Sequence, residues 1–234
     1  MLEPVLEIAG LHGHYGESHV LHGVDLSVGS GKVVTIVGRN GAGKTTTLRA
    51  VMGMLAKRAG SIRVMGTETI AFAPERVARL GVGYVPEERG IFASLNVAEN
   101  LFLPPVLAPG GMSSDEIYRL FPNLKERGRS QGSKLSGGEQ QMLAIARVLR
   151  TGARFLILDE PTEGLAPVLV QQIGKVLETI KEKGLTVLLV EQNFRFASRV
   201  SDSHYVMESG KIIDRLDREE VAGKMSRLEA YLGF

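Results

Sequence analysis

The residues best placed to do chemistry form a glycine-rich segment that ends in a lysine and two threonines. The segment is Gly38-Arg39-Asn40-Gly41-Ala42-Gly43-Lys44-Thr45-Thr46, which matches the phosphate-loop pattern G-x-x-x-x-G-K-[ST]. Glycines let backbone N–H groups converge on phosphate oxygens, and the N-terminus of a following helix adds partial positive charge. In this pattern Lys44 reaches the β and γ phosphates, and the Thr45 hydroxyl ligates Mg²⁺. The alternative is a glycine-rich turn that matches by accident, which would not require the predicted strand before it and helix after it.

Two neighbouring carboxylates form a second candidate site. Asp159 and Glu160 end the apolar run Phe155-Leu156-Ile157-Leu158, and ligands of open α/β sheets gather at such strand ends. By position, Asp159 suits a metal ion and Glu160 suits a base that activates water for in-line attack on a γ-phosphate. Without the phosphate loop, the two acids could equally be exposed groups at a strand end.

A third segment is informative through its context. It has the sequence Leu135-Ser136-Gly137-Gly138-Glu139-Gln140 and precedes the run that ends in Asp159. On its own it could be an ordinary turn, because glycines permit left-handed conformations and a serine caps a following helix. Together with a phosphate loop and a pair of strand-end acids, it gains a more specific interpretation.

Composition excludes several classes of site. The 234 residues are 44% hydrophobic and 23% charged, which is ordinary for a globular protein with a full core. The chain contains no cysteine, so disulfides, zinc ribbons and cysteine nucleophiles are ruled out. The chemistry of any site must therefore come from oxygen and nitrogen groups.

Charge and hydropathy make nucleic acid and membrane-spanning roles unexpected. Lys and Arg number 28 against 26 Asp and Glu, and no long block of like charge is present. The first residues carry acid where a signal peptide would carry base, and no apolar run approaches the ~20 residues that span a bilayer. We therefore expect a soluble, cytoplasmic protein with no nucleic-acid partner.

Short runs rich in Val and Ile alternate with longer helical patterns, which is typical of a parallel α/β sheet. Buried strands are predicted at 33–37, 83–85, 155–158 and 187–190. Residues 5–9 and 24–28 instead alternate apolar and polar side chains, as half-exposed antiparallel strands do. The predicted fold is α/β, with a mostly parallel core sheet preceded by an antiparallel β layer.

The middle of the chain is predicted to be helical. Residues 88–150 show no convincing strand, and Ser113 followed by Asp115 and Glu116 indicates a helix start. We expect one domain over 1–234, in which 1–87 and 151–234 form the nucleotide-binding core and 88–150 form a helical subdomain. The charged run 214–220 is expected to be a solvated turn and the start of a helix.

Taken together, these motifs resemble those of the nucleotide-binding subunit of an ABC transporter. The phosphate loop, the segment 135–140, the strand that ends in Asp159-Glu160 and the turn Glu163-Gly164-Leu165 occur in the order and spacing of that family. The resemblance covers essentially all 234 residues. It implies a P-loop NTPase of the ABC ATPase fold, with ATP and Mg²⁺ as cofactors.

The resemblance also assigns roles to individual residues. It places Tyr15 against adenine, although a strand aromatic that fills the β layer is the alternative. It places Glu87 at the metal, and Gln192 where most family members have a histidine that contacts the γ-phosphate. A glutamine amide can donate a hydrogen bond but cannot relay a proton, which favours Glu160 as the base. The metal set is then Thr45, Glu87 and Asp159; the catalytic set is Glu160, Lys44 and Gln192.

Departures from the common pattern narrow the branch. Glu87 stands where most members have Gln, and Gln192 stands where most have His. With the segments 140–146, 164–167 and Tyr231-Leu232-Gly233, these departures resemble the smaller ATPase of branched-chain and hydrophobic amino-acid importers. The segments 15–19 and 160–164 also resemble urea and short-amide relatives, so both solute classes stay open.

The family also implies partners. Residues Leu135 to Gln140 act in trans on the γ-phosphate that the other ATPase subunit holds, so we expect a dimer with an identical or paralogous subunit. Membrane permease subunits and a periplasmic or extracellular solute-binding protein complete such a system, at the cytoplasmic face of the plasma membrane. Ile91, Phe92 and Leu95 either touch the permease or pack the core of the helical subdomain.

Two other classes of P-loop protein fit the sequence less well. A soluble ABC ATPase of DNA repair or translation would be expected to carry a long heptad insertion, a zinc module, a basic arm or a second phosphate loop, and none is present. A P-loop kinase would leave the segment 135–140 without a role.

Overall fold

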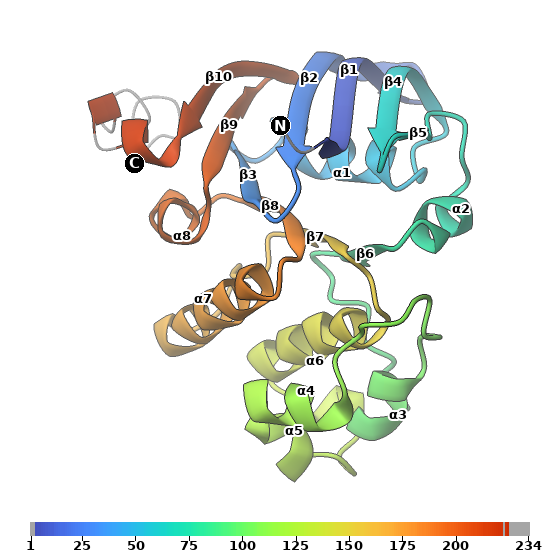
Figure 1. Cartoon of the computed structure of the whole chain (residues 1–234), viewed down its shortest axis with the longest axis vertical. Coiled ribbons are helices and arrows are strands. Elements are labelled where there is room, and N and C mark those ends of the chain that lie inside the picture. The colour runs from blue at the N-terminus through green and yellow to red at the C-terminus, as the bar shows by residue number, and fades with distance from the viewer. Residues whose placement is uncertain (1–2, 222, 225–234) are drawn as a thin grey trace.

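The computed structural model describes residues 3–221, 223 and 224. Figure 1 shows two sheets in the upper part of the molecule and a group of helices below them. The segment Tyr231-Leu232-Gly233, one of those that suggested the importer branch, lies outside the described residues. Among the residues that the structure describes, no helix is long and apolar enough to cross a membrane.

The larger sheet has six strands in the order β10 (Lys211–Asp217), β9 (Ser203–Glu208), β3, β8, β7 and β6. Strands β6 (Val82–Val85), β7 (Phe155–Asp159), β8 (Thr186–Glu191) and β3 (Val33–Val37) are parallel neighbours. These are the four strands predicted from their apolar runs. Every residue of β3, β7 and β8 is buried, as expected for a parallel sheet that is covered on both faces.

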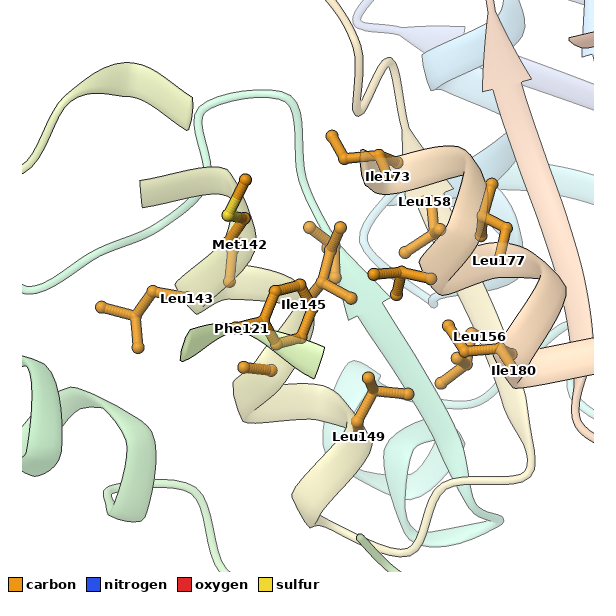
Figure 2. Packing of buried hydrophobic residues seen from close by; sticks show 14 of the residues in the cluster. Phe121, Met142, Leu143, Ile145, Leu149, Leu156, Leu158, Ile173, Leu177 and Ile180 are labelled. Atoms are coloured by element: carbon orange, nitrogen blue, oxygen red, sulfur yellow. The ribbon is translucent and has the colours of Figure 1, made fainter. Parts of the chain in front are cut away.

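Alternation along the buried strands separates two cores. On β7, Phe155 and Ile157 face a cluster that includes Leu48 of α1 (Lys44–Val51), whereas Leu156 and Leu158 face a second cluster. The second cluster contains residues of α6 (Gly137–Arg150) and α7 (Pro167–Glu182). Figure 2 shows side chains of α6 and α7 packed with Leu156 and Leu158. This packing ties the segment 135–140 to the main sheet.

The second sheet is antiparallel, with the order β2-β1-β4-β5. Strands β1 (Pro4–Tyr15) and β2 (Ser18–Gly29) confirm the predicted N-terminal layer but are longer than predicted. Strands β4 (Lys57–Val64) and β5 (Thr67–Glu68) were not predicted. A bulge at Gly10 brings its carbonyl oxygen against Gly60 on β4, where any side chain would clash.

Helices make up the predicted insert. It contains α3 (Val97–Phe102), α4 (Ser114–Leu120), α5 (Pro122–Glu126), a 3₁₀ turn at Gly132–Lys134, and α6. The helix start at Ser113 is confirmed, because its side chain accepts a hydrogen bond from the Glu116 N–H in a capping box. A single isolated bridge between Asn96 and Gln131 is the only β pairing within 88–150.

The remaining elements complete the main sheet and its flanks. They are α2 (Pro74–Arg79), α8 (Phe194–Val200), β9 (Ser203–Glu208) and β10 (Lys211–Asp217). The expectation for the charged run 214–220 was partly wrong, because its first residues lie in β10 and only Arg218–Glu220 form a 3₁₀ turn. Strand β10 pairs with β9 at the sheet edge and leaves most of its side chains partly exposed, so a charged sequence fits there.

Candidate functional site

The phosphate loop connects β3 to α1, as its pattern predicted. Gly41 (φ 80°) and Gly43 (φ 107°) have positive φ angles, which residues with a side chain rarely adopt. At Gly38 a side chain would collide with the carbonyl oxygen of Met207 on β9. Helix α1 begins at Lys44 with no side-chain cap and no acid in its first turn. No side chain therefore caps the first N–H groups of α1, as an anion site at a helix N-terminus requires.

Lys44 is held inside this loop. Its side chain is 4% exposed, and Nζ donates to the carbonyl oxygens of Gly38 at 2.9 Å and Arg39 at 3.2 Å. Nζ also forms an ion pair with Oε1 of Glu160 at 3.1 Å. The fold thus brings together the cation of the first motif and the carboxylate of the second, which are far apart in sequence.

Asp159 lies beside the first turn of α1. Its carboxylate accepts hydrogen bonds from the Thr45 hydroxyl at 3.0 Å and from the Tyr84 hydroxyl at 3.2 Å. Burial raises the pKa of Asp159 to about 6, against the two hydrogen bonds, and the charges of Glu160 and Glu87 raise it further. A cation near this carboxylate would favour its ionised form.

The donor set around Asp159 fits Mg²⁺. Thr45 and Glu87 line one cavity of about 350 Å³ with Lys44 and Glu160, and Asp159 contacts the Thr45 hydroxyl. The described residues contain no group of three or more His, Cys, Asp or Glu side chains able to hold a metal. Proteins usually bind Mg²⁺ through one or two carboxylates, while substrate phosphates and water supply the rest, and Asp159 and Glu87 are two such carboxylates. When bound, Mg²⁺ would neutralise charge on the phosphates.

Glu160 occupies a strained position directly after β7. Its φ of 44° lies in the left-handed region, which is uncommon for a residue other than glycine and is found at functional sites. Its backbone N–H donates to the Val190 carbonyl of β8 at 2.9 Å. A hydrogen bond with Glu160 raises the pKa of Glu163, and burial raises it further.

Glu160 and Glu163 lie where two cavities meet. Both line the 350 Å³ cavity beside the phosphate loop and a second cavity of about 460 Å³. Gln192 lines the second cavity, with Thr162 and Glu191. The structure therefore places Gln192 near Glu160, whereas Glu87 faces the cavity of the phosphate loop.

Tyr15 lies at the edge of this arrangement. It is 45% exposed at the end of β1, and its hydroxyl forms a hydrogen bond with Arg49 of α1 that raises the pKa of Arg49. Val20 of β2 lines the 350 Å³ cavity and Tyr15 does not. An exposed aromatic ring near α1 is free to stack on a planar ligand.

The segment 135–140 lies away from both cavities. Ser136 caps α6, with its hydroxyl accepting from the Glu139 N–H at 3.3 Å, and the Gln140 amide donates to the Leu135 carbonyl at 3.3 Å. At Gly138 a side chain would collide with Leu169 of α7. None of residues 135–140 lines the two cavities that contain Glu160.

Several residues around the site were not predicted. Tyr84 bonds Asp159, Glu163 bonds Glu160, and Glu191 bonds Thr162. Tyr84 lies in a predicted strand and Glu191 directly precedes Gln192. Their positions next to predicted elements or site residues could have suggested that they lie near the site. Their hydrogen-bond partners, however, lie in distant segments of the chain, which the sequence does not reveal.

A sequence profile described as ABC transporter matches residues 21–163. The chain belongs to the ABC transporter family. It is 39% identical over 223 residues to the high-affinity branched-chain amino acid transport ATP-binding protein BraG of Pseudomonas aeruginosa, covering 94% of this chain and 96% of that protein. The chain is accordingly an ABC ATPase, as its motifs predicted.

Two further relatives carry different names. The probable branched-chain amino acid transport ATP-binding protein LivF of Archaeoglobus fulgidus is 34% identical, with 89% of this chain and 90% of that protein covered. The lipopolysaccharide export system ATP-binding protein LptB of Haemophilus influenzae is also 34% identical, with 98% and 97% covered. The similarity to these proteins therefore does not decide between branched-chain amino acids and lipopolysaccharide as the transported substance.

Solved structures agree with the ABC ATPase fold. A nucleotide-free ATP-binding cassette from an ABC transporter superposes with a TM-score of 0.84 at 24% identity, covering 99% of both chains. The ATP-binding subunit of another ABC transporter gives a TM-score of 0.81 at 28% identity, covering 98% of this chain and all of that one. The predicted fold class is confirmed.

Proposed function

We propose that this chain is the ATP-hydrolysing subunit of an importer for branched-chain or other hydrophobic amino acids. The observation that carries the proposal is the 39% identity to BraG, which extends over nearly the whole of both proteins. The importer-like residues Glu87 and Gln192 support it. Membrane permease subunits would hold the chain at the cytoplasmic face, and a periplasmic or extracellular protein would deliver the solute.

In this proposal the phosphate loop binds ATP. The backbone of residues 38–43 and the N-terminus of α1 receive the phosphates, and Lys44 contacts their outer oxygens. Tyr15 stacks on the adenine ring. Thr45, Asp159 and Glu87 would hold Mg²⁺, which would supply positive charge to the phosphates.

The chain's own residues then position water for hydrolysis. Glu160 orients the water and removes its proton, since its carboxylate lies beside Lys44 at the junction of the two cavities. Gln192 donates a hydrogen bond from the neighbouring loop and cannot relay a proton.

A second subunit completes the site. We assign residues Leu135, Ser136, Gly137, Gly138, Glu139 and Gln140 to the γ-phosphate held by the partner ATPase, with the N-terminus of α6 directed at the anion. Helices within 88–150 then form the subdomain that carries this segment, between the core segments 1–87 and 151–234. The partner is an identical or a paralogous subunit.

The test combines partner capture with transport. Co-purification from membranes with permease subunits, followed by uptake of leucine dependent on this chain and on ATP, is the expected result. Uptake of urea or short amides instead would assign the chain to that related group. Capture with ribosomes or DNA, and no permease, would contradict the transport role.

A second candidate function follows from the similarity to LptB. Because 98% of this chain aligns with that protein, a subunit of lipopolysaccharide export is the competing assignment. Deletion of the gene distinguishes the two: loss of leucine uptake supports the importer, whereas loss of lipopolysaccharide from the cell surface with normal uptake supports export.

A further inference from the structure

We propose that Glu191 is a positioning residue for ATP hydrolysis. Its carboxylate links the loop that carries Glu160 to the loop that carries Gln192 through hydrogen bonds. The inference rests on the proposed roles of Glu160 as the base and of Gln192 at the γ-phosphate. Glu191 itself touches neither the phosphate loop nor Lys44 in the described contacts.

This link consists of three hydrogen bonds to one buried carboxylate. Oε1 of Glu191 accepts from the Thr162 N–H at 3.1 Å and from the Thr162 hydroxyl at 2.8 Å. Oε2 accepts from the Asn193 N–H at 3.4 Å. Glu191 is 2% exposed and Thr162 is 5% exposed, so water competes little for these bonds.

These hydrogen bonds lie close in sequence to both proposed catalytic residues. Thr162 lies two residues after Glu160, and Asn193 directly follows Gln192. The N–H of Glu160 also donates to the carbonyl of Val190 at 2.9 Å. The loop after β7 is thus attached to the end of β8 at two points, with Glu160 at the first and Thr162 at the second.

This second attachment matters because Glu160 is strained. A residue other than glycine holds a left-handed φ only when its surroundings determine that conformation. The turn that follows contains the bond from Glu163 N–H to the Glu160 carbonyl at 3.1 Å. Without the bond from Thr162 to Glu191, this turn would depend on fewer contacts to hold the carboxylate of Glu160 beside Lys44.

A carboxylate at this position carries a cost that an apolar residue would avoid. Burial raises the pKa of Glu191 to about 7, against the hydrogen bonds from Thr162 and Asn193, and the charge of Glu160 raises it further. The other residues of β8 between Val187 and Val190 are apolar and fully buried. A polar side chain at the end of this strand is therefore explained by the two loops it joins.

The experiment compares Glu191→Ala with Glu191→Gln in the full-length chain. We expect Glu191→Ala to lower kcat by about 10- to 100-fold, because a misplaced base or amide costs that much. ATP affinity should stay within about twofold, because Glu191 does not contact the phosphate loop. Glu191→Gln should keep kcat within about threefold, because the amide oxygen still accepts both hydrogen bonds from Thr162.

Hydrogen exchange supplies a measurement that does not depend on turnover. Glu191→Ala should accelerate exchange of the Thr162 and Asn193 amides, and Glu191→Gln should leave the Thr162 amide protected. If Glu191→Ala does not fold, Thr162→Val removes the hydroxyl bond from the other side and should lower kcat by about three- to tenfold.

Asp202 provides a matched control. Its carboxylate also joins two segments, accepting from the Val33 N–H at 2.9 Å and from Lys181 Nζ at 2.6 Å, but at the opposite end of β3. Asp202→Ala should leave kcat per folded molecule unchanged. A loss as large as that of Glu191→Ala would mean that any lost carboxylate link impairs the enzyme, and would overturn the proposal.

Two further outcomes would overturn it. Equal loss in Glu191→Gln and Glu191→Ala would show that the hydrogen bonds from Thr162 do not account for the role of Glu191. Wild-type kcat in Glu191→Ala or Thr162→Val would show that the link between the two loops is dispensable. Failure of the base assignment is separate: Glu160→Gln would then retain turnover, while hydrogen exchange would still report the link between Glu191 and Thr162.

Discussion

Lys44 and Glu160 are the two residues whose environments depend most on each other. The ammonium of Lys44 is buried among two carbonyl oxygens and the carboxylate of Glu160. A phosphate oxygen would compete with that carboxylate for the same ammonium, since both are anionic acceptors. Substitutions at these two positions should therefore affect binding and hydrolysis differently.

Glu160→Gln should retain ATP binding and slow hydrolysis by at least about 100-fold, because the amide cannot accept the proton of the attacking water. ATP affinity should stay equal or rise, because the variant no longer carries the anion that pairs with Lys44. Equilibrium binding and steady-state ATPase assays measure the two effects. Turnover near the wild-type rate would remove Glu160 as the base.

Lys44→Ala should weaken ATP binding by at least about tenfold, because a charged donor to the phosphates is lost. Hydrolysis should fall with it. Titration with ATP measures the change, and a substitution of the exposed Lys57 on β4 serves as the control. Unchanged affinity and hydrolysis in Lys44→Ala would contradict its proposed role.

His204 makes stability depend on pH. Burial lowers its pKa to about 4, and neither ring nitrogen has a hydrogen-bond partner among the described residues. The unfolded chain binds this proton near pH 6.5, so His204 contributes stability above that pH and loses it as the pH falls towards 4.

His204→Phe should remove this dependence, because its ring takes up no proton. The free energy of unfolding of the wild type relative to the variant should fall by up to about 3 kcal/mol between pH 7.5 and pH 4. Denaturant unfolding across this range measures the difference. Parallel pH profiles for the two proteins would show that His204 does not titrate as proposed.

At the scale of elements, strand ends and helix starts supply the site. Strands β3, β7 and β8 are parallel neighbours, so the phosphate loop, Glu160 and Gln192 emerge at one edge of the sheet. Helix α6 begins away from the two cavities that Glu160 lines, with Ser136 as its N-cap. The proposed function of Ser136 can be separated from capping because α4 has the same capping box at Ser113.

Ser136→Ala and Ser113→Ala should each cost about 1 kcal/mol of stability, because each removes one N-cap. Only Ser136→Ala should suppress the ATPase activity of the assembled complex, while ATP binding to the isolated subunit stays normal. Thermal unfolding and ATPase assays test this pair. Equal activities in the two variants would leave Ser136 with a capping role alone.

At the scale of the whole molecule, the chain contains two separated parts of a proposed composite site. The cavities around Glu160 do not include residues 135–140. Leu135 belongs to the apolar cluster on one face of the main sheet, whereas Ala42 of the phosphate loop belongs to the cluster on the other face. If these parts complete each other in a dimer, ATPase activity per subunit should rise with protein concentration.

This dependence can be measured on the purified chain. Activity per subunit should increase steeply at low concentration and level off once dimers predominate. Glu160→Gln should stabilise the ATP-bound dimer, which light scattering or sedimentation would detect. Equal specific activity in the monomer and in the assembled complex would contradict the shared site.

Much of the fold was predictable because local patterns agree with tertiary environments. The apolar runs of β3, β7 and β8 are buried on both faces, so their composition reveals them. Strand β4 escaped prediction because Lys57, Arg58 and Gly60 resemble a loop, and its pairing with β1 sets its conformation. Strand β10, at the edge of the six-stranded sheet, was missed for a similar reason, because its charged sequence resembles a turn and its pairing with β9 sets its conformation.

The sequence by itself determined the family, the phosphate loop and the two acids at the end of β7, because these depend on residue types at fixed local spacing. Only the tertiary structure decided that Glu160 forms an ion pair with Lys44. It also decided that Tyr84 and Thr45 both donate hydrogen bonds to Asp159, and that Glu191 accepts one from Thr162. Those contacts join segments far apart in the chain. Their partners are chosen by strand order and burial, which local spacing does not encode.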